Sequence, residues 1–193
     1  WRLDPKKAGI SSCMGDIGVH AFNMIEFTTG LQIKSLLCDF NYLYDDNQMD
    51  VDGTVLLRLD QHVKGVLRAS QVATGEENGL AIRIYGENAG LVWEQERPNF
   101  LYKLSDTAPV QVYKPGHAYN SELSLDGTKL PAGHPEGIFD AMGNIYRGVA
   151  KAIRGAKFNE GEFPTITDGV RGMNFIEATV ASHKGGNIWV DLD

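Results

Sequence analysis

A change from helical to strand periodicity occurs within GDIGVHAFNMIEFTTGLQIKSLLCDF, residues 15–40. From Gly15 to about Thr29 the apolar residues recur three and four positions apart, which is the spacing of a helical face. Gly30 predicts the helix stop, because glycine readily takes the left-handed conformation of a C-cap. The next ten residues, Leu31–Phe40, are rich in apolar and β-prone side chains and predict the first strand.

Short β-prone runs separated by turn signals continue to about residue 114. After the first run they are Thr54–Asp60, Gly65–Ala73, Leu80–Tyr85, Gly90–Gln95, Phe100–Leu104 and Val110–Tyr113. Asp52-Gly53 and the glycine-rich segments at 76–79 and 86–90 read as the turns between them. Consecutive strands on short loops favour an antiparallel meander over βαβ units.

The second half of the sequence returns to helical spacing. Ile138 to about Arg154 predicts one helix, and a second helix capped by Thr167 or Asp168 runs to about His183. A last strand is expected at Asn187–Leu192. We therefore expect an α+β protein, an open and mainly antiparallel sheet with helices packed on one face, as a single domain over residues 1–193.

The expected sheet has two different faces. Alternation along Leu80–Tyr85 makes one face apolar, and this face should meet the helices. The other face mixes charge with large apolar and aromatic side chains: Arg83, Tyr85, Leu91 and Trp93. That mixture favours an interface between copies of the chain, with a solvated face carrying scattered aromatics as the alternative.

Composition excludes several classes of protein. The net charge of −7 repels phosphate backbones, so no nucleic-acid partner is expected. No apolar run approaches the roughly 18 residues of a membrane span, so no membrane association is expected. Two cysteines, Cys13 and Cys38, are too few for a disulfide scaffold and read as small core residues. Together these features predict a soluble, cytoplasmic protein.

Asp16 and His20 are the strongest candidates for chemistry. They are four residues apart, which places both side chains on one face of the expected helix. A carboxylate beside an imidazole orients the ring and favours its protonated form, which suits a general base. Gly15 and Gly18 have no packing purpose inside a helix, so they suggest that a ligand or backbone approaches closely. A purely structural Asp–His pair and a metal-binding pair are the alternatives.

Among the other histidines, His134 lies in PAGHPEG, residues 131–137. Two prolines and two glycines restrict this loop, so it could hold an imidazole in a fixed position, and a rigid connector with an incidental histidine is the alternative. His62 and His183 are expected at the surface, and no partner is expected for His117.

The sequence resembles one enzyme family at several places. Gly15-Asp16-Ile17-Gly18-Val19-His20 and the apolar helix after it resemble the Gly-Asp-Ile-Gly-x-His segment of the glucose–fructose oxidoreductase, inositol dehydrogenase and MocA family. The final segment from Thr167 to Trp189 is similar to the same family, and the opening Trp1-Arg2-x-Asp4-Pro5 and residues 133–137 are similar to one branch of it. The resemblance covers essentially the whole chain.

The resemblance implies a fold and a chemistry. The family's C-terminal domain resembles dihydrodipicolinate reductase in fold, and its members oxidise or reduce sugars, inositols and related polyols or carbonyls with NAD or NADP. It implies catalytic roles for Asp16 and His20, and substrate-binding roles for Arg2 and His134. The family's catalytic lysine, in a Glu-Lys-Pro motif, and its glycine-rich cofactor fingerprint belong to an N-terminal Rossmann domain.

Neither of those two motifs occurs in this sequence. The resemblance therefore implies a substrate-binding half whose NAD or NADP is bound mainly by a missing Rossmann domain, and a chain that begins inside a longer protein. The expected partners are a small sugar or polyol, that Rossmann domain and other copies of the chain. This half alone is expected to be inactive. Two alternatives are a non-catalytic sensor or assembly member of the same fold, and a metal-dependent hydrolase or isomerase using His20, Asp16 and His134.

Overall fold

The computed structural model describes residues 1–43, 49–159 and 161–192. The protein is α+β, and every strand pair is antiparallel, as the sequence predicted. The strands divide between two four-stranded sheets, β3-β2-β1-β8 and β4-β5-β6-β7. The residues form two compact units, Trp1–Gly75 with Pro164–Asp193, and Glu76–Phe163. The single domain of the sequence analysis stays a prediction, and we describe each unit by itself.

The sheet of the first unit pairs two long strands with a third strand and a short one. These are β1 (Ile33–Tyr42), β2 (Asp50–Leu59), β3 (Lys64–Ser70) and β8 (Val190–Asp191). The predicted turn at Asp52-Gly53 is wrong, because Gly53 lies within β2 and pairs with Phe40. A Cβ at Gly53 would lie 2.9 Å from the Phe40 ring, so glycine provides space for this core side chain.

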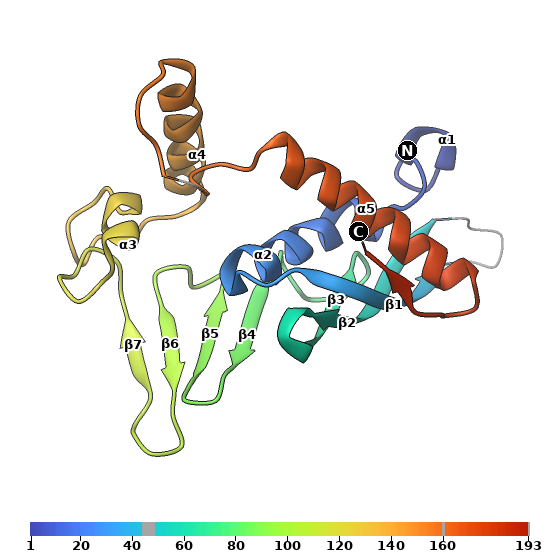
Figure 1. Ribbon diagram of the computed structural model, residues 1–193, viewed down its shortest axis with the longest axis horizontal. Helices are drawn as coiled ribbons and strands as arrows, with labels where there is room; N and C mark the ends of the chain where they lie inside the picture. Colours follow the sequence, from blue (N-terminus) through green and yellow to red (C-terminus); the bar gives the residue numbers. More distant parts are fainter. Residues whose placement is uncertain (44–48, 160, 193) are drawn as a thin grey trace. The chain divides into compact units, whose positions relative to one another are not determined.

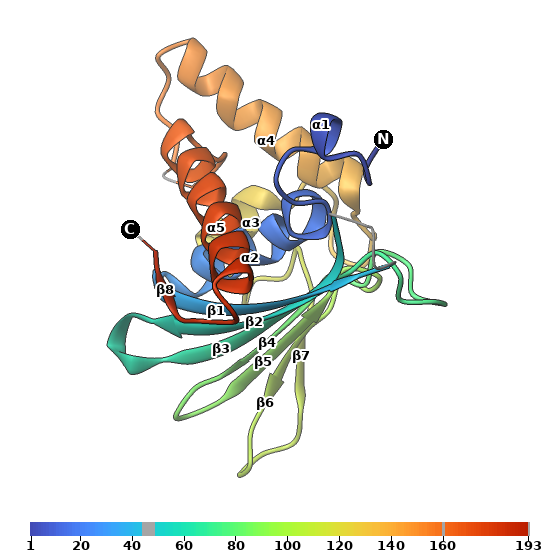
Figure 2. The ribbon, with the colours of Figure 1, turned by 90° about the vertical axis from the view of Figure 1, so that its right-hand side faces the viewer.

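Two helices cover one face of this sheet, α2 (Val19–Thr29) and α5 (Ile166–Lys184). Figure 2 shows both on the same side of the strands. Between the helices the Phe22 and Phe175 rings stack with centroids 4.5 Å apart. Both rings are buried, as are Leu36 and Val55 on the strands below, so the core lies between the helices and the sheet.

One ion pair joins both helices to the sheet. The Arg171 guanidinium of α5 donates to both carboxylate oxygens of Glu26 on α2, each at 2.7 Å. Its Nη2 also donates to the carbonyl oxygen of Ile33 at 2.7 Å. Because both charged side chains are mostly buried, this bidentate contact fixes how the two helices pack.

The ends of the helices follow local chemistry. The N-cap of α5 is Thr165, two residues before the predicted Thr167 and three before Asp168, and Asp168 completes a capping box. The Thr165 backbone N–H and hydroxyl donate to the Asp168 carboxylate at 2.6 and 2.7 Å and lower the pKa of Asp168. A short helix, α1 (Pro5–Ala8), is capped by Asp4, whose carboxylate accepts from the Lys6 backbone N–H at 3.0 Å.

His183 near the end of α5 is not a surface residue as predicted. Its side chain is 20% exposed, and its Nδ1 accepts a hydrogen bond from the backbone N–H of Phe40 at 3.2 Å. Its ring also packs beside the rings of Phe40 and Tyr42. Polar sequence neighbours suggested exposure, but a contact 143 residues away determines the burial of this side chain. The predicted surface position of His62 is confirmed in the short turn η2 (Asp60–His62).

The second unit carries the meander β4 (Ala81–Tyr85), β5 (Gly90–Glu94), β6 (Leu101–Leu104) and β7 (Gln111–Tyr113), which Figure 1 shows in sequence order. The register between β4 and β5 contradicts the predicted composition of the two sheet faces. Leu91 pairs with Ile84, and Trp93 pairs with Ile82, so both lie on the face of the isoleucines. Arg83 pairs with Val92 and lies on the opposite face together with Tyr85. The hairpin turn sets this register, and alternation within each strand does not reveal it.

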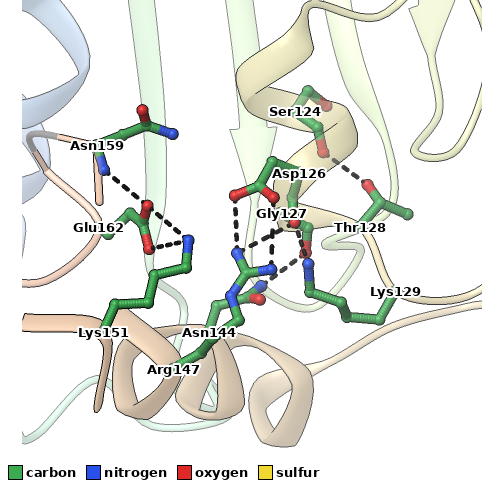
Figure 3. A network of polar contacts seen from close by, with 10 residues as sticks. All are labelled: Ser124, Asp126, Gly127, Thr128, Lys129, Asn144, Arg147, Lys151, Asn159 and Glu162. Atoms are coloured by element: carbon green, nitrogen blue, oxygen red, sulfur yellow. Dashed lines mark hydrogen bonds and ion pairs between the residues drawn. The ribbon is translucent and has the colours of Figure 1, made fainter. Parts of the chain in front are cut away.

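Two helices complete this unit, α3 (Glu122–Gly127), which the sequence analysis missed, and α4 (Ile138–Ile153), which it predicted. Figure 3 shows how α4 is attached to its neighbours. Arg147 donates to the Asp126 carboxylate at 2.9 Å, and Asn144 donates to the Gly127 carbonyl at 2.6 Å. Lys151 pairs with Glu162 at 3.0 Å.

None of the helices in the described part of the chain has the length and apolar content that a membrane crossing requires.

Candidate functional site

The conspicuous Gly-Asp-Ile-Gly segment forms a single π-helical turn, η1 (Met14–Gly18), which leads directly into α2. The Val19 N–H donates to the Met14 carbonyl oxygen five residues earlier, which defines the wider turn. The prediction of a uniform α-helix from Gly15 is therefore wrong over its first turn. Such π turns occur often at functional sites.

Core packing explains one of the two glycines. Met14 is completely buried, and its thioether lies against Gly18, where an added Cβ would clash with the sulfur. The expectation that both glycines leave space for a ligand or backbone is thus wrong for Gly18, which makes room for Met14. At Gly15 the nearest atoms to an added Cβ are those of Ser11 at 3.9 Å, an ordinary contact.

The Asp16 carboxylate is held by residues from two distant parts of the first unit. Its Oδ2 accepts from Arg2 Nε at 3.2 Å and from Gln71 Nε2 at 3.0 Å. Arg2 also lies over the Trp1 ring, with 4.7 Å from Cζ to the ring centroid. The Asp16 side chain remains 44% exposed, so it is accessible to a small molecule. The structure therefore brings together Asp16 and Arg2, two of the four residues predicted for the site.

His20 lies in the first turn of α2 and is exposed. Within the described residues no hydrogen bond or ion pair joins it to Asp16. The wider turn at Met14–Gly18 changes the angle between positions four apart, so the spacing of a regular α-helix does not apply. Both side chains are exposed and lie four positions apart in the sequence, and Arg2 and Gln71 orient the Asp16 carboxylate.

A buried carboxylate anchors the chain just before this turn. Asp50 is 2% exposed, and its Oδ1 accepts from the Ser12 backbone N–H at 2.7 Å. Its Oδ2 accepts from the Met14 backbone N–H at 2.9 Å and from the Ser11 hydroxyl at 3.0 Å. Because a buried carboxylate needs several donors, this arrangement fixes the entry to η1 against β2. Asp50 was not predicted as a site residue, although a charged residue at the start of an apolar strand is a signal for such an anchor.

The two cysteines are buried core residues, as predicted. Burial, reinforced by the charge of Asp50, raises the pKa of each thiol to about 12. Both thiols therefore favour their protonated form near neutral pH.

His134 belongs to the second unit. Its backbone N–H donates to the Pro131 carbonyl oxygen at 3.1 Å, and its Nδ1 lies 3.1 Å from the same oxygen. The loop is braced by Glu136, whose carboxylate accepts from the backbone N–H groups of Lys129 and Leu130 at 2.5 Å each. The His134 side chain is exposed. Its substrate-binding role stays a prediction.

No group of three or more His, Cys, Asp or Glu side chains that could hold a metal ion occurs among the residues that the structure describes. The alternative of a metal-dependent hydrolase or isomerase, with Asp16, His20 and His134 as ligands, therefore receives no support from this part of the chain.

Comparisons with known proteins agree with this fold. Residues 1–92 match the family model described as the GFO/IDH/MocA C-terminal domain. An uncharacterized oxidoreductase of Bacillus subtilis, YfiI, is 32% identical over 201 residues, which cover the whole of this chain and 51% of the relative. The chain thus spans about half the length of the curated relative that it matches.

Solved structures give the same result. An oxidoreductase from Sinorhizobium meliloti is 37% identical with a TM-score of 0.86, over 92% of this chain and 51% of its own. An inositol dehydrogenase homolog from Azotobacter vinelandii, complexed with NAD+, is 31% identical with a TM-score of 0.87, over 99% of this chain and 51% of its own. An inositol dehydrogenase homolog from Azotobacter vinelandii, complexed with NADH and myo-inositol, is 29% identical with a TM-score of 0.82, over 99% of this chain and 51% of its own.

The sequence resemblance therefore has independent support from a family model, from a sequence relative and from the antiparallel α+β architecture of solved structures. Residues 1–92 of this chain match the GFO/IDH/MocA C-terminal domain, and the whole chain is similar in sequence and fold to one half of bacterial oxidoreductases.

Proposed function

We propose that this chain is the substrate-binding and catalytic half of an NAD(P)-dependent oxidoreductase acting on a sugar, an inositol or a related polyol or carbonyl. The observation that supports this most strongly is the Asp16 carboxylate, accessible yet oriented by two donors, one helical turn before the exposed imidazole of His20. The Azotobacter relative, which was crystallised with NADH and with myo-inositol, supports the same substrate class.

The dinucleotide fits poorly on this chain itself. Pyrophosphate groups bind at helix N-termini whose backbone N–H groups are open. At the start of α4 and of α5 a carboxylate is already present: Asp140 accepts from the N-cap N–H of Gly137, and Asp168 accepts from the N-cap N–H of Thr165, so a negative charge opposes a phosphate at both places. The chain also lacks the glycine-rich fingerprint of a dinucleotide site. We therefore assign NAD or NADP to the half of the protein that this chain does not include, where the cofactor supplies the hydride acceptor.

The residues of this chain would handle the proton and orient the substrate. As a secondary alcohol is oxidised, its hydroxyl proton must leave, and His20 is the base that takes it. Asp16 accepts a hydrogen bond from a substrate hydroxyl, because its carboxylate is an acceptor with a free oxygen. Arg2 uses Nε on Asp16, and its two terminal nitrogens can donate to substrate oxygens. In the reverse direction His20 returns the proton to the carbonyl oxygen.

The predicted homo-oligomer is part of this proposal. On the face of the second sheet that carries Arg83, the side chains of Tyr85 and Val112 are 73% and 43% exposed. Exposed aromatic and apolar side chains that share a sheet face with an arginine are typical of an interface.

The proposed activity is tested on the full-length protein with NAD+ and with NADP+. A panel of myo-inositol, D-glucose, D-xylose and glycerol is assayed by the absorbance of the reduced nicotinamide. We expect turnover of at least one cyclic polyol or aldose, with deuterium moved from the substrate carbon to the nicotinamide. His20→Ala is the matched control and should abolish most of the turnover. If neither cofactor is reduced by any of these compounds, and neither reduced cofactor is consumed with the matching ketones and lactones, the proposal is wrong.

A further inference from the structure

Gln71 connects the buried anchor of the site to its exposed carboxylate. It directly follows β3, and its backbone N–H donates to the Val51 carbonyl oxygen at 2.8 Å. Its side-chain Oε1 accepts from the Ser12 hydroxyl at 3.2 Å, and its Nε2 donates to Asp16 Oδ2 at 3.0 Å. Because an ionised carboxylate can only accept, the amide nitrogen must be the atom that faces Asp16.

Ser12, which donates to the Gln71 side-chain oxygen, is itself fixed in position. The Ser12 backbone N–H donates to Asp50, which is buried and takes two further hydrogen bonds from Ser11 and Met14. Ser12 itself is 4% exposed. The Ser12 hydroxyl therefore holds the oxygen of the Gln71 amide, and the amide nitrogen donates to the accessible Asp16 carboxylate.

The two oxygens of that carboxylate are used unequally. Arg2 and Gln71 both donate to Oδ2, and Oδ1 takes no hydrogen bond from any described residue. A carboxylate held through one oxygen keeps its second oxygen at a defined position with its lone pairs open to a donor. An aspartate without these two contacts would rotate about its side-chain bonds, and substrate binding would then cost the ordering of that rotation.

We propose that Gln71 is a positioning residue for the reaction: it holds Asp16 by Oδ2, so that Oδ1 receives the hydroxyl of the bound polyol. This inference rests on the proposed function, since it requires Asp16 to contact the substrate. Gln71 acts through Asp16 and makes no contact with the reacting atoms. Its contribution should therefore disappear when the Asp16 carboxylate is absent.

A double-mutant cycle in the full-length protein tests this directly. Gln71→Met keeps the length of the side chain and removes both of its polar contacts. It is measured alone and together with Asp16→Ala, with myo-inositol as the probe, or the compound of the panel above that is oxidised fastest. Gln111→Met is the matched control, because Gln111 is an exposed glutamine with one long contact, 3.4 Å, to the Tyr113 hydroxyl.

We expect Gln71→Met to lower kcat/KM about tenfold, the usual effect of losing one hydrogen bond to a charged group. In the Asp16→Ala background the same change should lower kcat/KM less than about twofold. The melting temperature should fall by no more than about 4 °C, the effect of losing about one hydrogen bond at the Ser12 hydroxyl, since Gln71 itself is exposed and lies outside the core. Gln111→Met should leave both quantities unchanged.

Three results would overturn the inference, and they can be told apart. If Gln71→Met costs the same factor with and without the Asp16 carboxylate, Gln71 acts independently of Asp16. If Gln71→Met alone retains the parent kcat/KM, the contact with Asp16 has no effect on the reaction. In both cases a strong effect of Asp16→Ala by itself would leave the proposed function standing. If Asp16→Ala itself has no effect, the catalytic assignment and the positioning role are both wrong.

Discussion

Replacing Asp50 by asparagine should destabilise the first unit strongly. The two carboxylate oxygens of Asp50 take three hydrogen bonds inside the protein, and the side chain is 2% exposed. Asparagine offers only one oxygen. The better orientation keeps that oxygen on the N–H of Met14 and the hydroxyl of Ser11. The new amide group then faces the backbone N–H of Ser12, donor against donor.

The cost follows from these contacts. One hydrogen bond to a charged acceptor is lost, at about 1.5–3 kcal/mol, and one buried N–H is left without an acceptor, at about 1–3 kcal/mol. Together they predict a loss of about 3–5 kcal/mol for Asp50→Asn. For a chain of this length each kcal/mol shifts the melting temperature by roughly 2–4 °C, so we expect a decrease of about 6–20 °C.

Thermal unfolding of the 193-residue chain, followed by near-UV circular dichroism, measures this change. Asp106→Asn is the matched control, because Asp106 is an exposed loop aspartate without a hydrogen bond in the described part of the chain. The control should melt within about 1–2 °C of the parent. If Asp50→Asn also melts within about 2 °C of the parent, then the buried carboxylate does not hold the entry to η1 as we describe.

Three further expectations concern packing, thiols and pH. Gly169→Ala should raise the free energy of unfolding by up to about 1 kcal/mol, because alanine favours a helix and the added Cβ meets no other atom within 4 Å. Gly172→Ala should lower the free energy of unfolding, because the Cβ added at this position would lie 3.1 Å from Val19. Urea unfolding measures both changes. Neither cysteine should react with a disulfide reagent until the protein unfolds; early reaction would contradict their burial. Because its pKa is lowered in the folded protein, the ionised Asp168 stabilises the folded state above pH 3.8, and this contribution is lost as the pH falls further. The difference in free energy of unfolding between the parent and Asp168→Asn should therefore vanish at low pH. A difference that stays constant would contradict this.

Local patterns were sufficient to predict most of the elements. The apolar spacing within Ile138–Ile153 gave α4 with its start correct, and the β-prone runs gave the antiparallel meander. Periodicity works here because a helix or strand must turn one face to a core, whatever that core contains. The short helix α3 was missed because six residues are too few for a helical period to show.

Features that depend on distant contacts could not be read in this way. Gln71 reaches Asp16 across 55 positions, and Asp50 reaches Ser12 across 38, with no local pattern in either case. The register between β4 and β5 depends on the geometry of a hairpin turn, so the composition of the sheet faces was wrong. The π turn begins at the buried Met14. It changes the angle between the Asp16 and His20 side chains, which the spacing in the sequence does not reveal.

The central claim is that Asp16 and His20 are catalytic groups and not part of the scaffold. The most direct test measures kcat and the melting temperature together for His20→Ala and Asp16→Asn in the full-length protein. We predict that His20→Ala lowers kcat by about 10²–10⁴, the usual contribution of a positioned acid–base group, while both variants melt close to the parent because both side chains are exposed. Two variants that melt far below the parent, but turn over normally when folded, would contradict the claim.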